Sequence, residues 1–110
     1  MTVLQPVRRR KAVRLQVDEF QWDDLNESHL SHGFDPVIAE EVRLIAPRFW
    51  VNKRSATGTH LMVGPSSTGL FWTVSILRVR GGMWRPITGF PSARWHIERY
   101  RVLVMGRPLT

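Results

Sequence analysis

The pattern of apolar and polar positions begins with an alternating segment near the start of the chain. From Ala12 to Val17, apolar side chains largely alternate with polar ones. A two-residue period is typical of a strand that buries one face. We therefore expect a first strand at 12–17, which Phe20 and Trp22 extend.

Two acidic residues mark the start of a first helix. Asp23 or Asp24 can accept hydrogen bonds from the free amides of a first helical turn. The pattern predicts a short helix through Leu30, and Gly33 follows as its stop signal. We expect the wet side of this helix to be acidic.

A second helix start stands at Asp35-Pro36, where an N-cap residue precedes a proline at the first helical position. This helix is expected to run to about Ile45, and Pro47 marks its end. Four apolar residues recur at helical spacing and predict its buried stripe: Val37, Ile38, Val42 and Ile45. Glu40 and Glu41 are expected to point away from the core.

The next part of the chain has the pattern of a sheet. Four apolar runs are separated by turn residues, and they cover 49–51, 60–63, 70–79 and 83–88. Gly81-Gly82 can supply the positive φ angles of a tight hairpin turn. We therefore expect a four-stranded antiparallel meander.

The final periodic segment predicts a helix. Pro91-Ser92 provides an initiator and an N-cap, and the residues from Arg94 to about Val104 carry Ile97 and Tyr100 at helical spacing. A strand at 101–105 is the alternative. The complete order, an N-terminal strand, two helices, the meander and a C-terminal helix, predicts an α+β fold with helices packed on one sheet.

Length and composition limit the class of protein. A chain of 110 residues supports one core that buries about 65% of the surface of the unfolded chain. We take 12–110 as a single domain and 1–11, with its Arg8–Lys11 cluster, as a flexible basic arm or, equally, a solvated tail. The absence of cysteine excludes a disulfide framework and fits a cytoplasmic protein. No apolar run approaches the roughly 20 residues that a bilayer span needs, so we expect no membrane partner.

Charge is sorted along the chain and changes the picture of its partner. From Asp18 to Glu41 there are eight acids and no Lys or Arg, whereas from Arg43 to Thr110 there are eleven bases and one acid, Glu98. A net charge of +7 and this segregation favour a polyanion on the basic half. Nucleic acid is preferred over anionic lipid, because no long amphipathic basic helix is visible.

Short motifs resemble a known family. Those in the first half are Trp22-Asp23, Asn26, His29-Leu30, His32-Gly33, Pro36 and Glu40-Glu41-Val42. Those in the second half are His60-Leu61-Met62-Val63-Gly64, Gly69, Trp84-Arg85-Pro86-Ile87-Thr88, Arg94, Arg99 and Tyr100. Together they resemble BrnT-like toxins of the RelE superfamily from about Phe20 to Tyr100. The resemblance implies a RelE/BrnT-like fold and a ribonuclease toxin that blocks translation and is neutralised by a cognate ribbon-helix-helix antitoxin.

The chain departs from that family at two places that matter for activity. The family's Ser-Ala-Arg type triplet after the last strand is here Thr88-Gly89-Phe90, and the acidic residue expected early in the last helix falls near His96. A literal Ser92-Ala93-Arg94 follows slightly later, so Arg94 and Glu98 are candidates to replace the missing groups. An inactive site is the alternative.

RNA cleavage without a metal needs a base, an acid and cations around the phosphorus. His96, Arg99 and Tyr100 are spaced so that a helix places them on one face, and His96 titrates near neutral pH. Arg99 would hold phosphate, and Arg85 on the last strand would add a second donor. We expect a catalytic group of His96, Arg99, Arg85, Tyr100 and Arg94, although a solvated histidine and a packed tyrosine explain the same pattern.

Other basic residues are candidates for RNA binding. Lys53, Arg54, Arg78 and Arg80 occur near tryptophans on which bases can stack. Five tryptophans in a small domain are nevertheless more often core residues. Arg94 and Glu98 are expected to form an ion pair at i, i+4, and packing or capping explains His29 and His32 better than a metal does. We expect no metal and no cofactor.

The leading hypothesis is therefore a metal-independent RNA-cleaving toxin that inhibits translation, with RNA and an antitoxin as partners. The alternative is a catalytically inactive nucleic-acid-binding or inhibitory module of the same fold, which Phe90 in place of an arginine favours. A third class, a protein-interaction domain, would use the acidic helices as its interface. Self-association into a homo-oligomer stays open.

Overall fold

The computed structural model describes residues 11–31, 35–53 and 58–105, which form three helices and five strands. The elements in chain order are β1 (Glu19–Phe20), α1 (Asp24–Ser31), α2 (Pro36–Ile45), β2 (Arg48–Val51), β3 (His60–Pro65), β4 (Phe71–Arg80), β5 (Met83–Pro91) and α3 (Arg94–Met105). The three expected helices are confirmed, including the final one, for which a strand had been the alternative. The α+β class is also confirmed.

The strands form a single mixed sheet in the order β1-β5-β4-β3-β2. Consecutive strands from β2 to β5 are antiparallel neighbours. β1 lies beside β5 and runs parallel to it, with Glu19 opposite Met83 and Phe20 opposite Trp84. The sheet therefore differs from the expected four antiparallel strands, because β1 adds a fifth strand that runs parallel to β5 at its edge.

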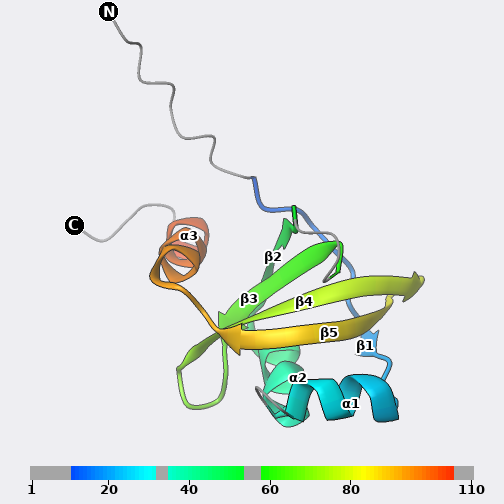
Figure 1. The fold of residues 1–110 in the computed structure, drawn as a ribbon. Coiled ribbons are helices and arrows are strands. Elements are labelled where there is room, and N and C mark those ends of the chain that lie inside the picture. Colours follow the sequence, from blue (N-terminus) through cyan, green and yellow to red (C-terminus); the bar gives the residue numbers. More distant parts are fainter. Residues whose placement is uncertain (1–10, 32–34, 54–57, 106–110) are drawn as a thin grey trace, which may run out of the picture.

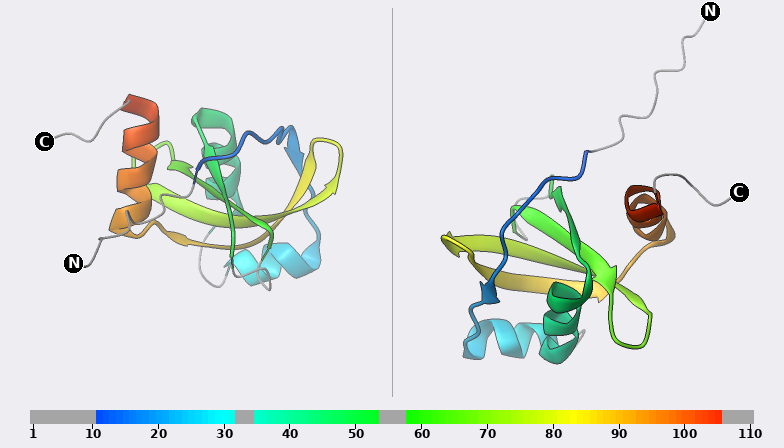
Figure 2. Two further views of the ribbon diagram at one scale, coloured as in Figure 1. Left: turned by 90° about the horizontal axis from the view of Figure 1, so that it is seen from above. Right: turned by 180° about the vertical axis from the view of Figure 1, so that it is seen from behind.

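Residues 12–17 do not form the expected strand. Val13 makes one isolated bridge to Phe49, and regular pairing begins only at β1. The reason is the path of this segment, which we call the N-terminal strap (residues 11–18). The strap crosses one face of the sheet from β2 to β5 instead of lying beside a strand, as Figure 2 (right) shows. Its alternation is real, since Val13, Leu15 and Val17 pack against the core.

Both N-terminal helices begin where the acidic caps predict. The Asp23 carboxylate accepts hydrogen bonds from the amides of Leu25 and Asn26 at the start of α1. Asp35 accepts from the Val37 amide at the start of α2, whose first residue is a proline. The end signal expected at Gly33 lies outside the described residues.

The buried stripe of α2 is narrower than expected. Ala39 and Val42 are fully buried, but the side chains of Val37 and Ile45 are 60% and 49% exposed. The helix packs closely on β3: a Cβ placed on Gly64 would lie 3.2 Å from a methyl group of Val42. Ile38 is half-buried and also packs against the core, so the stripe predicted from the sequence is confirmed at Ile38 and Val42 and not at Val37 and Ile45.

Side chains alternate between the two faces of the sheet and build two cores. Phe49, Met62, Val74 and Ile76 join the larger core with α2 and the strap. Their neighbours in sequence, Trp50 and Val63, join a smaller core with Tyr100 of α3. Since successive strand residues point to opposite faces, α3 lies on the other side of the sheet from α2, as Figure 1 shows.

The turn at Gly81-Gly82 is confirmed, with φ of +48° at Gly81. β5 then continues three residues beyond its expected end, to Pro91. Ser92 is not the N-cap of α3 as expected: its hydroxyl lies 2.8 Å from the Thr73 hydroxyl, and the helix starts at Arg94. The physical reason is that the Ser92 amide still donates to Phe71, which prolongs the pairing of β5 with β4.

Among the helices in the described part of the chain, none combines the length and the apolar character needed to cross a membrane.

Candidate nucleic-acid interface

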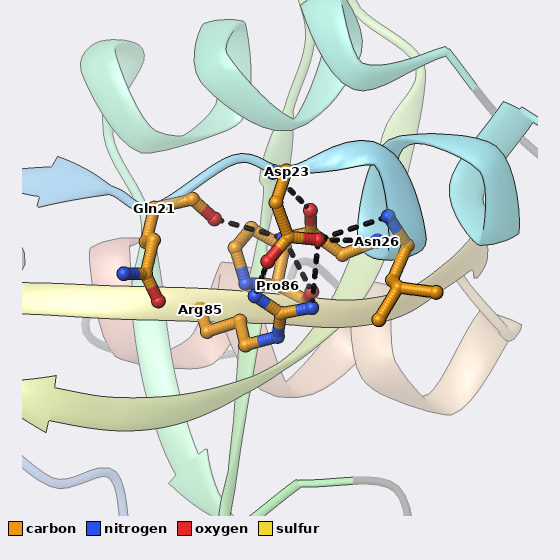
Figure 3. A network of polar contacts seen from close by, with 6 residues as sticks. Gln21, Asp23, Asn26, Arg85 and Pro86 are labelled. Carbon is orange, nitrogen blue, oxygen red and sulfur yellow. Dashed lines mark hydrogen bonds and ion pairs between the residues drawn. The ribbon is translucent and has the colours of Figure 1, made fainter.

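Arg85, expected as a phosphate donor, is held by an acidic partner. Both terminal nitrogens of its guanidinium donate to the Asp23 carboxylate, one of them over 2.9 Å (Figure 3). The Arg85 guanidinium is the main cause that lowers the pKa of Asp23 from 3.8 to about 2. The pair joins the start of α1 to β5, and it uses the planar fork of Arg85 for a contact within the protein.

Asn26 completes the same network from a buried position (Figure 3). Its side-chain oxygen accepts from the Asp23 amide over 2.8 Å, and its amide nitrogen donates to the carbonyls of Gln21 and Pro86. Trp22 packs against the core and donates to Glu40 on α2. The Trp22-Asp23 and Asn26 motifs therefore fix α1 onto the sheet and take no part in an open site.

His96 lies between α3 and the sheet, with only 7% of its surface exposed. Its Nδ1 is 3.1 Å from the Thr73 hydroxyl, which in turn is 2.8 Å from the hydroxyl of Ser92. Ser92 is half-buried. These three side chains form a hydrogen-bonded chain from the interior to the edge of α3.

The other expected residues of α3 have different surroundings. Tyr100 is buried and donates to the Ala46 carbonyl over 2.7 Å, and burial raises the pKa of its phenol. The Arg99 guanidinium lies 4.7 Å from the ring centre of Trp95, which is half exposed. The Arg94 side chain is 94% exposed and is 3.8 Å from Glu98, so the expected i, i+4 ion pair is confirmed.

The structure does not bring the five expected catalytic residues together. Thr73, the partner of His96, is opposite Phe90 on β5. Arg85 is five residues earlier on the same strand, which corresponds to about 17 Å at 3.4 Å per residue. Four of the five residues belong to α3 at one end of the sheet, and Arg85 belongs to the other end.

Basic residues gather at that other end, where the β4–β5 hairpin projects. Arg78 and Arg80 are exposed near the end of β4, and Arg14 of the strap is exposed beside them. Lys53 is exposed just beyond β2, whose last residue, Val51, is opposite the first residue of β3. Arg54 lies outside the described residues. We call Arg14, Arg78 and Arg80 the basic hairpin end.

A hollow of about 480 Å³ opens at the basic hairpin end. The strap forms one wall, and the starts of β3 and β5 with the end of β4 form the rest. Its lining includes Arg14, Thr59, His60, Arg78, Gly82 and Trp84. Two guanidinium groups and an imidazole thus border one open space, which is the arrangement that an anionic group needs.

Neighbouring side chains fix the orientation of His60 in this hollow. Its Nδ1 is 2.9 Å from the Thr59 hydroxyl, and its ring meets that of Trp84 edge to face at 5.3 Å between centres. Trp84 is itself held, because its indole nitrogen donates to the Gln16 carbonyl of the strap. Burial lowers the pKa of His60, so the neutral imidazole is favoured while the hollow is empty.

Sequence reasoning missed Arg14 and His60. Arg14 looked like one outward position of an alternating strand, and His60 looked like the start of another strand. Their residue type was the signal that the sequence offered. The hollow forms where the strap meets β3, β4 and β5, which follow it in the sequence by more than 40 residues.

Within residues 11–31, 35–53 and 58–105, no group of three or more His, Cys, Asp or Glu residues is arranged to hold a metal ion. Of the His29 and His32 pair, the His29 side chain and all of His32 lie outside the described part. Comparisons with protein-family models, curated proteins and solved structures found no match for this chain.

Proposed function

We propose that this domain binds RNA through the basic hairpin end. The observation that carries the proposal is that its arginines form no ion pair with a carboxylate of the described residues. Arg43, Arg85 and Arg94 each pair with a carboxylate, whereas no carboxylate of the described residues forms an ion pair with Arg14, Arg78 or Arg80. The Nε–H of Arg78 donates to the Gly81 carbonyl over 3.1 Å. A guanidinium without a carboxylate partner keeps its positive charge for phosphate.

The choice of RNA is supported by two arguments. The resemblance to BrnT-like toxins implies an RNA target, and an open hollow suits an unpaired nucleotide better than a regular duplex. Proteins that recognise single-stranded RNA hold nucleotides that are turned out of the stack and combine cations with aromatic or polar side chains. The hollow offers both kinds of group in Arg14, Arg78 and His60.

The test is a binding titration with a short fluorescent single-stranded RNA. We expect Arg78→Gln and Arg80→Gln each to weaken binding and to lower the logarithmic salt slope by about 0.7, the value for one phosphate contact on a single strand. Arg101→Gln is the matched control, because it removes the same charge from exposed α3, at the other end of β4. Equal losses in all three variants would indicate a general charge effect and would contradict the assignment of this surface.

RNA cleavage by a toxin is the second candidate function, and the Ser92–Thr73–His96 chain favours it. Such a chain can pass a proton between the edge of α3 and a buried imidazole. Arg94 and Arg99 on the same helix would hold the phosphate, and a ribbon-helix-helix antitoxin would mask the charge. The active site would then lie at α3 and the binding surface at the hairpin end.

This second candidate has its own test. Purified protein is incubated with a structured RNA in the presence of chelator, beside His96→Gln and Arg99→Ala. Cleavage that disappears in both variants, with their circular dichroism unchanged, supports a metal-independent nuclease. Intact RNA that remains bound to the wild-type protein leaves the binding module as the function and removes the nuclease.

A further inference from the structure

The hollow beside His60 has features that RNA binding in general does not explain. A basic surface needs only exposed cations, but this hollow is also lined by an imidazole that is oriented by Thr59 and Trp84. The strap holds both Arg14 and the carbonyl that fixes Trp84. Several separate contacts therefore keep His60 in one orientation at the side of the two arginines.

We propose that this hollow binds one phosphodiester group of the RNA together with a proton on the His60 imidazole. The inference rests on the proposed function, since it names the part of the ligand that enters the hollow. Arg14 and Arg78 would approach the phosphate from two walls of the hollow, the strap and β4. A protonated imidazole then supplies the third donor.

The hydrogen-bond geometry of His60 suits this role. A protonated imidazole has two N–H donors. The Nδ1–H donates to the Thr59 hydroxyl, which lies 2.9 Å away. The Nε2–H is then the donor left for a ligand, and Thr59 determines which nitrogen that is.

The charged groups around His60 explain why the proton arrives with the ligand. Partial burial of the imidazole opposes a positive charge on it. Arg14 of the strap and Arg78 of β4 line the same hollow. Asp18 of the strap lies next to Gly82, at the rim, where its carboxylate is exposed and accepts from Gln16. Lys53 follows the neighbouring strand. A bound phosphodiester brings a negative charge among these cations and so favours the charged imidazole.

The consequence is a link between RNA affinity and pH. A phosphodiester keeps its charge between pH 5.5 and 8, so only His60 changes its state in the hollow over this range. The effect is confined to the pH range between two pKa values of His60, the lower one without RNA and the higher one with RNA. Within this range, a fall of one pH unit strengthens binding by up to about tenfold. We expect a gain of about fivefold or more between pH 7.5 and 5.5.

The experiment follows the ring protons of His60 by NMR through a pH titration, with and without a short single-stranded RNA whose ends carry no phosphate. His60→Gln assigns the signal. We expect the midpoint of the His60 signal to rise by about one pH unit or more with RNA, in accord with a contact between opposite charges. His60→Gln should bind RNA with an affinity that is nearly independent of pH. Arg80→Gln, whose side chain lies outside the hollow, should bind more weakly and keep the pH dependence.

Each outcome separates the inference from the function on which it rests. If RNA binds and the His60 midpoint does not move, the inference is overturned and RNA binding stands. If RNA does not bind but inorganic phosphate raises the midpoint, the hollow is a phosphate site and the proposed function is overturned. If RNA does not bind and inorganic phosphate does not move the midpoint either, both fail. The wild-type titration decides these cases even if His60→Gln does not fold.

Discussion

Asn26 makes three hydrogen bonds from an almost fully buried position, two of them to the segment that precedes α1 and one to β5. Removing its amide leaves the Asp23 amide and the carbonyls of Gln21 and Pro86 without this partner. We expect Asn26→Ala to lower the free energy of unfolding by about 3 kcal/mol, within the range for buried groups that lose their partners. Urea denaturation measures this change. Leu25→Ala, one residue earlier and 78% exposed, should stay within about 0.5 kcal/mol of the wild type.

Asp23 gives the protein a pH dependence in acid. Its pKa is lowered from 3.8 to about 2, first of all by Arg85. A carboxyl group with a lowered folded-state pKa adds stability that is complete above its unfolded pKa and disappears as the pH falls toward its folded pKa. The window is therefore from about pH 4 down to 2. Thermal melting should show a smaller loss across this window in Asp23→Asn than in the wild type, and identical slopes would contradict the assignment.

At the level of single residues, the sequence identified chemistry but not neighbours. Arg85, His96 and Tyr100 have the side chains that RNA cleavage needs, and the sequence places two of them one helical turn apart. It could not show that Asp23 holds Arg85 from 62 positions away, or that Tyr100 donates to a backbone carbonyl. Such partners depend on how distant segments meet, which a local pattern does not record.

At the level of elements, local signals worked where the physics is local. Asp35-Pro36 predicts the start of α2 because an N-cap and a proline act within one turn. Gly81-Gly82 predicts the hairpin because the turn itself requires positive φ. The strap was wrong as a strand because alternation reports which side chains are buried, whereas strand pairing needs a neighbouring backbone. Its residues have the first property and largely lack the second.

The anchor of α3 provides a test at this scale. The Tyr100 hydroxyl donates to the Ala46 carbonyl just after α2, and its ring meets that of Phe71 at 5.0 Å. Tyr100→Phe keeps the ring and removes the hydrogen bond. We expect a loss of about 1 kcal/mol, the typical net value of one such bond. Amide hydrogen exchange should rise mainly in α3. An equal rise in α1 would mean that the bond supports the whole domain.

At the scale of the whole molecule, the acidic and basic halves of the sequence differ in the contacts that their charged side chains make. Acidic residues of the first half are used internally: Asp23 holds Arg85, Glu40 holds Arg43, and Glu41 accepts from the amide and hydroxyl of Ser67. The arginines of the hairpin end have no such partners within the described chain. Composition alone predicts a polyanion, and the exposed arginines of the hairpin end are the residues on which the RNA proposal rests.

The salt dependence of binding tests the molecule-wide proposal. Three arginines that each contact one phosphate of a single strand give a slope of about −2 for log affinity against log salt, at roughly 0.7 per contact. Affinity measured from low to moderate salt by fluorescence anisotropy provides the slope. A slope near zero would remove the electrostatic basis of RNA binding. A much steeper slope would point to further contacts, and Lys53 is the first residue to change in that case.

The strap has a consequence for the order in which the protein is made. The strap and β1, which follows it, leave the ribosome before the other strands, yet β1 pairs with Met83 and Trp84, which are synthesised 64 positions later. Until the β4–β5 hairpin has emerged, Arg78 is not there to line the hollow with Arg14, and Trp84 is not there to pack against His60. A nascent chain therefore carries the positive charge of Arg14 before the hollow exists, and the proposed phosphate site is complete only after the β4–β5 hairpin has been translated.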